Sequence, residues 1–415
     1  MEHRKVVNNR IGIAHMFWFY WSALVLWQNL GRETPRNGGD LVFKTGLIFL
    51  LTAFYLLRAR WVSIHIFAVF LLAVSMAASL VLSGDALSGG SLIAYAYPVL
   101  LAFLSFGIGN DFQINKRELL FFLKGVILVT LYAALYALFF CTDQFITAFS
   151  HESAYGNELT SFFVSSHEYG MYLVYAIVAC VICMEVEQKT VWKKIAYTAA
   201  ILIFLPNLFL TFSRTSLLAL AVAVLAYCLA GKWTPLRRGI VVAVALFAAM
   251  VFFSSRLREF IVLLLFKGQE KIGIRGELYP FAVKLFWEGS CAQKLFGCGT
   301  GVRSVFEAAM NHGSVHNAYL QVLLYFGSVN LVFFVVLLIS QLKENIRLYR
   351  HSKFFSVMFA ACLLSAMALM FTNTTIVFTS PIDSFFLTVF TILVPKYVRN
   401  AIRAGAFEEK RAFNG

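Results

Sequence analysis

Apolar runs about 20 residues long recur from one end of the 415-residue chain to the other. A transmembrane helix needs about that length, and so many runs leave little sequence for a soluble domain. The composition agrees, because 60% of the residues are hydrophobic and only 13% are charged, against about 25% charged in soluble domains. The sequence therefore predicts an all-α polytopic membrane protein, with residues 1–415 forming a single transmembrane domain.

Helices are the expected spanning structure, because lipid requires every backbone group to be satisfied within the segment. We predict twelve, near residues 11–30, 41–57, 62–83, 91–108, 118–141, 169–186, 194–212, 215–230, 236–254, 317–340, 354–374 and 383–398. The apolar run 259–266 is too short to cross and is predicted to be interfacial or re-entrant. Because Arg32 and many further spans follow the first run, we expect that run to remain as a helix rather than to be a cleaved signal peptide.

The distribution of Lys and Arg residues predicts the orientation. With the N-terminus inside, 22 of the 35 fall in cytoplasmic segments, 8 in the loop 255–316, and 3 in the other outer segments. Cytoplasmic loops carry an excess of positive charge, so both termini are predicted to be cytoplasmic. The clusters lie between apolar runs, which suits loops facing anionic lipid rather than a nucleic-acid groove, so no nucleic-acid partner is expected.

The two long outer loops differ in charge. Loop 142–168 has no Lys or Arg, whereas loop 255–316 carries eight: Arg256, Arg258, Lys267, Lys271, Arg275, Lys284, Lys294 and Arg303. Outer loops normally avoid positive charge, and an anionic ligand held at the outer face is the simplest reason for so many. We therefore predict that residues 255–316 form an extracytoplasmic catalytic loop within the transmembrane domain.

Several function classes lack their sequence signatures. The chain has no P-loop, no Gly-rich dinucleotide fingerprint and no zinc-type Cys/His set, which argues against an ATP-driven pump and against redox chemistry with a cofactor. We expect no cofactor. Five of the seven cysteines lie in or beside apolar runs, while Cys291 and Cys298 fall in the long loop. Those two are compatible either with a disulfide or with two free thiols.

Arg214 lies in the sequence Ser213-Arg214-Thr215, between two apolar runs joined by almost no loop. One interpretation is an arginine that extends to the membrane interface. The other is functional, because a guanidinium held in a tight outer turn presents a planar set of donors suited to a pyrophosphate or a carboxylate.

Arg275 precedes a helical stripe of apolar residues at positions 278, 281, 282, 285 and 286, which also includes Tyr279. This is either a surface amphipathic helix with solvated charges or a helix start that binds an anion, with Arg275 just before the first turn. A flexible glycine turn, Gly297-Cys298-Gly299-Thr300-Gly301, follows, and is weak evidence by itself.

His316 and Asn317 open a predicted span on the outer side. A histidine at a helix start is often structural, but an imidazole titrates near neutral pH and is suited to proton transfer at this surface. His312 lies four residues earlier, so the pair has metal-binding spacing; since no third ligand is evident, we predict no metal. His167 and Glu168 precede the sixth span and are expected to line the same outer cavity.

These motifs together resemble the O-antigen polymerase/O-antigen ligase superfamily of Wzy-like and WaaL-like proteins. The similarity is carried by Ser213-Arg214-Thr215-Ser216, by Arg275 to Phe286 followed by the glycine turn, and by His316-Asn317-Ala318-Tyr319-Leu320-Gln321 to Phe326-Gly327. It covers about residues 160–340, whereas the first five spans match only in being hydrophobic. In place of the Asn-Pro-Asn that often precedes the sixth span of that family, this chain has Ser166-His167-Glu168-Tyr169.

The resemblance implies a GT-C-like, inverting, metal-independent glycosyltransferase of the bacterial plasma membrane, acting on an undecaprenyl-pyrophosphate-linked glycan at the outer, periplasmic face. Arg214 and Arg275, with Arg303, would bind the pyrophosphate, and His316 would orient or deprotonate the acceptor hydroxyl. His167, Glu168, His312, Asn317 and Tyr279 are further candidates for the acceptor side of the cavity.

Three functions remain open. The first is a polysaccharide polymerase, in which donor and acceptor are both lipid-linked repeat units and a chain-length regulator is a possible partner. The second is an O-antigen ligase that transfers the glycan to lipid A-core or another acceptor. The third is a flippase or transporter for lipid-linked sugar, which we rank last because transporters place polar residues in the middle of the membrane and show internal repeats.

Overall fold

The computed structural model describes residues 66–83, 89–107, 113–150, 158–163, 165–187, 191–229, 235–266, 275–311, 315–371 and 386–405. All regular secondary structure in these ranges is helical. The elements are α3 (Ile66–Leu82), α4 (Gly89–Ala102), η2 (Phe103–Gly107), α5 (Lys116–Phe140), α6 (Thr142–Ser150), α7 (Ser166–Val186), α8 (Val191–Leu210), α9 (Arg214–Leu229), α10 (Pro235–Phe253), α11 (Ser255–Phe266), α12 (Arg275–Glu288), α13 (Cys291–Phe296), α14 (Val302–Met310), α15 (Ala318–Arg347), η3 (Leu348–Arg350), α16 (Lys353–Met370), η4 (Val389–Leu393) and α18 (Val394–Arg403).

Length and composition identify the helices that belong in a membrane. Among the described ranges, α5, α7, α8, α15 together with η3, and α16 are long and apolar enough to cross a bilayer, and α3 and α9 are apolar but shorter. Large apolar side chains on the outside of the bundle include Leu128, Leu202, Leu225 and Val332, each at least 60% exposed. So much exposed apolar surface requires lipid around it. The protein is therefore a helical membrane protein, as the sequence predicted.

The predicted spans from 62–83 to 354–374 each contain an observed helix. The first two predicted spans, 11–30 and 41–57, lie outside the described residues, and the last is described only from residue 386. The count of twelve and the GT-C-like architecture therefore stay predictions.

The structure differs from the predicted spans in three places. The span predicted at 91–108 is divided into α4, which contains Pro98, and the π-helical turn η2. The span predicted at 317–340 is longer, since α15 runs to Arg347, and it is broken at Gly327, whose φ of 84° is not helical. The loop predicted at 255–316 contains four helices, α11 to α14. One of them, α11, has 12 residues, about 18 Å, and is too short to span a bilayer.

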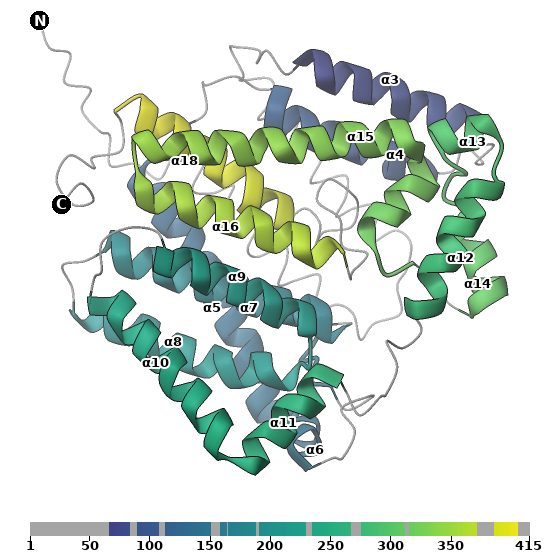
Figure 1. The fold of residues 1–415 in the computed structure, drawn as a ribbon. Coiled ribbons are helices and arrows are strands. Elements are labelled where there is room, and N and C mark those ends of the chain that lie inside the picture. The colour runs from purple at the N-terminus through teal and green to yellow at the C-terminus, as the bar shows by residue number, and fades with distance from the viewer. Residues whose placement is uncertain are drawn as a thin grey trace, which may run out of the picture.

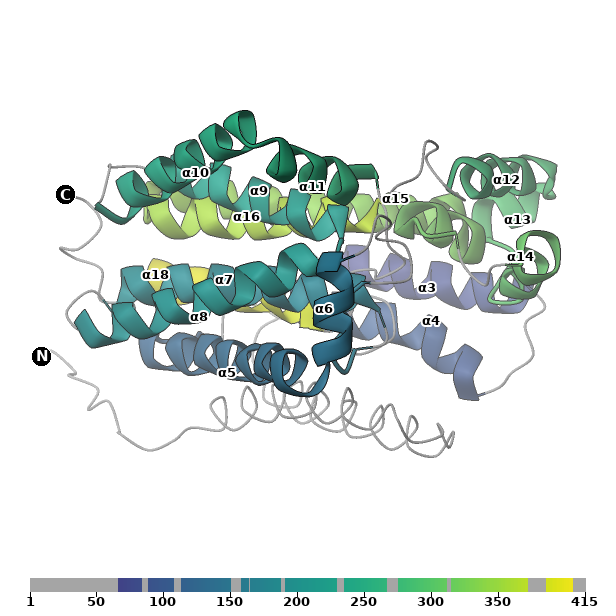
Figure 2. The same ribbon diagram turned by 90° about the horizontal axis from the view of Figure 1, so that it is seen from below.

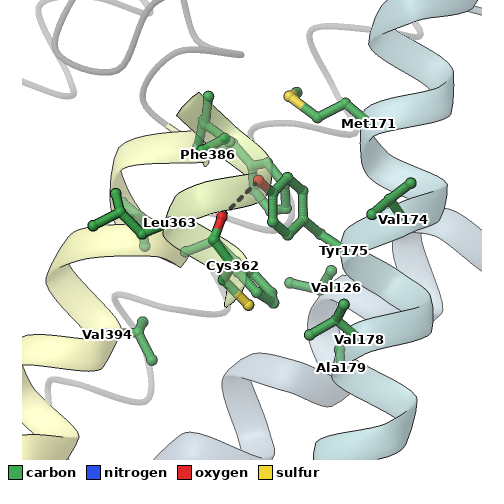
Figure 3. Close-up of a cluster of buried hydrophobic side chains, with 14 of the residues drawn as sticks. Val126, Met171, Val174, Tyr175, Val178, Ala179, Cys362, Leu363, Phe386 and Val394 are labelled. Carbon is green, nitrogen blue, oxygen red and sulfur yellow. Dashed lines mark hydrogen bonds between the residues drawn. The ribbon is translucent and has the colours of Figure 1, made fainter. Parts of the chain in front are cut away.

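Helix α7 is the centre of the bundle. In its apolar stretch 94% of the residues are buried, against 33% for α8. Tyr175 of α7 donates a hydrogen bond to the carbonyl oxygen of Cys362 on α16, at 3.4 Å, and its ring packs against Phe386, which lies just before η4 (Figure 3). Figure 3 also shows Val126 of α5 in the same cluster. Because α7 has almost no face left for lipid, its position is fixed on all sides.

One end of the bundle, here called the basic end, gathers Lys and Arg side chains. Glu187, which caps α7, accepts hydrogen bonds from Lys124 of α5 and from Lys193 and Tyr197 of α8, at 2.9, 2.9 and 2.6 Å. Nearby, the guanidinium of Arg237 stacks on the ring of Tyr227, 4.9 Å from its centroid. Burial alone would raise the pKa of Glu187, but these three hydrogen bonds outweigh it and lower the pKa to about 2.

The helices alternate in direction between the basic end and the opposite end. Helices α5, α8 and α16 begin at the basic end, whereas α7, α9 and α15 finish there. The segments predicted to be cytoplasmic therefore lie at the same end of the bundle. Helices α12, α13 and α14 lie together beyond the opposite end in both views (Figures 1 and 2). We call this opposite end the site end, because the residues singled out by the sequence lie there.

Replacing Glu187 by Gln is expected to lower the free energy of unfolding by about 1–2 kcal/mol at neutral pH, because three donors lose a charged acceptor. Since the pKa of Glu187 is lowered in the folded state, this contribution is complete above the ordinary carboxyl pKa and is lost as pH falls toward 2. Thermal unfolding in detergent measures it. Glu288→Gln is the matched control, because its pair with Lys284, at 3.7 Å, is exposed. Equal melting shifts for the two variants would contradict the assignment.

Candidate functional site

The turn that carries Arg214 is three residues long and tightly hydrogen-bonded. Thr211 Oγ1 donates to the carbonyl oxygen of Leu208 at 2.7 Å and accepts from the amide of Ser213 at 3.2 Å. Phe212 is fully buried and has a left-handed φ of 47°, which is costly for a residue with a side chain and requires support from its surroundings. Arg214 follows as the first residue of α9 and is half-buried. The short turn predicted between the two spans is therefore present and is held rigidly.

His167 lies against this turn. Its Nδ1 is 3.0 Å from Ser213 Oγ, which is in turn 2.8 Å from Ser216 Oγ. Helices α7 and α9 approach closely because Gly170 has no side chain: a Cβ there would lie 2.5 Å from Ser216 Oγ. The sequence predicted that His167 lines the outer cavity, and the structure brings it next to Arg214. The sequence did not predict that Gly170 allows this close approach or that Ser213 and Ser216 contact α7.

Glu168 follows His167 in the first turn of α7. Its amide donates to the Oγ of Ser165, the N-cap residue, at 3.2 Å, and its side chain is half-buried. A carboxylate in a first helical turn interacts favourably with the helix dipole. In the structure Glu168 thus stabilises the start of α7. Its role at the cavity stays a prediction.

His316 and Asn317 form the start of α15. Asn317 is the N-cap, with Oδ1 accepting from the amides of Tyr319 and Leu320 at 3.0 and 3.1 Å. His316 has a left-handed φ of 52° and is half-buried. The hydroxyl oxygen of Tyr279 lies 3.1 Å from the carbonyl oxygen of His316 and 3.0 Å from that of Phe371. The structure therefore joins the predicted candidates Tyr279, His316 and Asn317.

Helix α16 connects this group to the Arg214 turn. Ser365 Oγ donates to the carbonyl oxygen of Ala219 at 2.9 Å, and Phe354 packs edge-on against Tyr227. These two contacts show that α9 and α16 are antiparallel, so the last turn of α16, which ends beside Phe371, is level with Arg214 at the start of α9. Arg214 and His316 accordingly lie at the same end of the bundle, on either side of that turn.

Arg275 is the first residue of α12, one helical turn before Tyr279. The sequence placed it just before the helix, and the helix instead includes it; helix ends are set by which residues find backbone partners, and periodicity alone does not fix them. Because Tyr279 contacts His316, the start of α12 is at the site end together with the starts of α9 and α15.

Arg303 is the remaining predicted candidate among the described residues, and its helix α14 packs on α12 through the rings of Phe306 and Phe281. Arg303 is on α14 and forms an ion pair with Glu307 at 2.9 Å, with both side chains at least half exposed. His312 lies outside the described residues. Within the ranges described, no group of three His, Cys, Asp or Glu side chains is placed to hold a metal ion.

The two loop cysteines are free thiols in the structure. Cys291 is exposed, whereas burial raises the pKa of the Cys298 thiol above its ordinary value. A higher pKa means less thiolate and lower reactivity, so Cys298 is not an activated nucleophile.

No known family model matches the chain, and no curated protein matches it closely enough to count as a relative.

Replacing Gly170 by Ala is expected to separate the starts of α7 and α9 and to destabilise the protein by about 1–3 kcal/mol, because the new Cβ would overlap Ser216. Thermal unfolding measures the loss. Gly239→Ala on α10 is the control, since a Cβ at Gly239 meets nothing within 4 Å. Unchanged melting of the Gly170 variant would show that the two helix starts are not in close contact.

Proposed function

We propose that this protein is a bacterial surface-polysaccharide polymerase. It joins undecaprenyl-pyrophosphate-linked oligosaccharide repeat units by inverting, metal-independent glycosyl transfer at the outer face of the plasma membrane. The observation that supports this proposal best is the gathering of Arg214, the start of α12 at Arg275, and His316 at one end of an apolar bundle. Two arginines and an imidazole beside a membrane surface suit a lipid-linked pyrophosphate and a sugar hydroxyl.

In the proposed reaction, a hydroxyl oxygen of the acceptor sugar attacks C1 of the donor sugar from the face opposite the pyrophosphate. The C1–O bond breaks, and its electron pair leaves with the pyrophosphate. His316 takes the proton of the attacking hydroxyl. Pyrophosphate is already a good leaving group, so no strong general acid is needed, and the two guanidiniums stabilise the negative charge that develops on it.

The rigid Arg214 turn suits this role. A donor group stabilises a transition state best when it is already oriented, because no reorganisation is then needed during the reaction. Ser213 and Ser216, with His167 hydrogen-bonded to Ser213, fix the first turn of α9 from which Arg214 extends. Arg303 is proposed as a lesser pyrophosphate ligand, since its exposed pair with Glu307 contributes little and is easily exchanged.

A reconstituted assay with the purified protein and undecaprenyl-pyrophosphate-linked repeat units as sole substrate tests the proposal. A ladder of longer lipid-linked chains is expected. Transfer only after addition of lipid A-core would make the protein a ligase. Movement of the lipid-linked sugar across the membrane without any new glycosidic bond would make it a transporter.

Arg214→Ala, Arg275→Ala and His316→Ala are each expected to lower glycan transfer at least ~100-fold, because each removes a charge or proton acceptor from the reacting groups. Yield and thermal unfolding should be close to those of the parent protein. Arg350→Ala and His351→Ala at the basic end are controls, since both side chains are exposed and neither is placed at the site. If all three site variants kept near-normal activity, the assignment of these residues would be wrong.

Chelators are expected to leave the transfer rate unchanged, because arginine side chains supply the positive charge that a metal would otherwise provide. The measurement is the initial rate of chain growth with and without a chelator of divalent ions. Strong inhibition that a divalent ion reverses would contradict the metal-independent mechanism.

A further inference from the structure

Two Phe-Gly pairs far apart in the sequence pack against each other at the break in α15. Phe296-Gly297 ends α13, and Phe326-Gly327 ends the first part of α15. A Cβ on Gly297 would lie 2.3 Å from the carbonyl oxygen of Tyr325, and a Cβ on Gly327 would lie 2.2 Å from that of Leu295. The contact is thus reciprocal and made by backbone alone; we call it the glycine contact.

Both glycines also need their backbone freedom. Gly297 has φ 89° and Gly327 has φ 84°, a region that residues with a Cβ rarely adopt. Any other residue at either position would meet both backbone strain and a clash with the opposite chain. The glycine turn, which the sequence predicted to be flexible, is instead firmly docked.

The hydrogen bonds at this place replace those that the broken helix lacks. The amides of Cys298 and Gly299 donate to the carbonyl oxygens of Leu324 and Tyr325 at 2.8 and 3.1 Å. The carbonyl oxygen of Phe326 accepts from Ser79 Oγ of α3 at 3.1 Å and from Asn330 Nδ2 at 2.7 Å. The last carbonyl groups of a helix normally lack intrahelical partners, and here three in succession have partners outside their own segment.

The segment of α15 before the break is therefore held at its far end by α13, by α3 and by the side chain of Asn330. This segment, Ala318–Phe326, begins directly after His316 and Asn317, and Figure 1 shows it turned away from the rest of α15 on the side of α13. Nine residues of helix are about 13 Å long, so a tilt of about 10° at the break would move His316 by about 2 Å.

We propose that Gly297 and Gly327 are positioning residues that act through His316: the glycine contact sets the direction of Ala318–Phe326 and thereby holds the imidazole against the acceptor hydroxyl. This inference rests on the proposed function. A misplacement of about 1 Å at a reacting group can cost on the order of 100-fold in rate, so the contact need only slip slightly to matter. Arg214 is held by α7 and α8, so its position on the donor side does not depend on the glycine contact.

The test uses Gly297→Ala and Gly327→Ala in the reconstituted full-length protein. Each is expected to lower kcat about 10- to 100-fold while the KM for the lipid-linked donor changes less than about 3-fold. Because both variants break one contact, the double variant should be no worse than the single ones. Adding Gly297→Ala to His316→Ala should cause no further loss, whereas a further loss of tenfold would show that the glycines do not act through His316.

Gly405→Ala is the matched control, because Gly405 has a similar positive φ of 69° but a Cβ there meets nothing within 4 Å. Hydrogen exchange gives a readout that does not depend on activity: the amides of Cys298 and Gly299 should exchange faster in the Gly297 and Gly327 variants only. Faster exchange with unchanged kcat would overturn the positioning role and leave the proposed function intact. Activity retained by His316→Ala would overturn the role of His316 and with it this inference, whereas no chain growth by the parent protein would overturn the proposed function; the exchange data would still report the contact.

A gentler variant covers the case in which the alanine variants do not fold. Ser79→Ala removes the hydrogen bonds from Ser79 to the Phe326 carbonyl and from Asn330 to Ser79 without adding bulk, and a kcat lowered about fivefold is expected, in line with a contribution of about 1 kcal/mol. Ser75→Ala is its control: Ser75 is buried one turn earlier on α3, and its hydroxyl has no hydrogen-bond partner in the structure as described. Equal kcat for both serine variants would overturn the inference.

Discussion

The position of Arg214 depends on the contact between Gly170 of α7 and the two serines of the α9 start. Helix α7 is buried on nearly all sides, so its first turn cannot move without disturbing the whole bundle. Gly170 lets the backbone of α9 approach until Ser213 and Ser216 touch α7 and His167 reaches Ser213. The position of Arg214 is in this way fixed by a helix of the buried core. A flexible arginine on a loose loop would bind the same anion with a larger entropy cost.

Each backbone carbonyl of a membrane helix needs a hydrogen-bond donor, which explains why polar residues lie where the helices of the bundle break or end. In lipid a carbonyl group without a partner is costly, so breaks occur only where protein supplies donors. At Gly327 the donors are Ser79, Asn330 and the glycine turn. At the end of α16, the carbonyl of Met367 and that of Phe371, the residue after the helix, accept from the hydroxyls of Tyr319 and Tyr279. The same hydrogen bonds that satisfy these carbonyl groups also hold the His316 region in place.

The sequence predicted the features that depend on apolar periodicity and on residues close together in the chain. The helices, the short turn before Arg214, and the start of a span at Asn317 all follow from local patterns. It did not predict that residues 255–316 form four helices, or that the glycine turn packs on α15, because Gly297 and Gly327 are 30 residues apart and each is explained only by the other. The partnership of His167 with Ser213 is also long-range. For Arg303, the residue type suggested an anion ligand, whereas its place on α14 depends on tertiary packing.

The two ends of the bundle differ in the electrostatic contribution of the helix dipoles. At the site end, α7, α9, α12 and α15 begin, so their positive dipole ends lie there together with Arg214 and Arg275. Helices α5, α8 and α16 end there, and their negative dipole ends act in the opposite direction; at the end of α16, tyrosine hydroxyls engage the carbonyls of Met367 and Phe371. At the basic end Glu187 pairs with two lysines and offsets part of their charge. Positive charge at the basic end is thus partly compensated within the fold. At the site end Arg214 and Arg275 lie at helix starts, where a guanidinium and a positive dipole end act on an anion in the same direction.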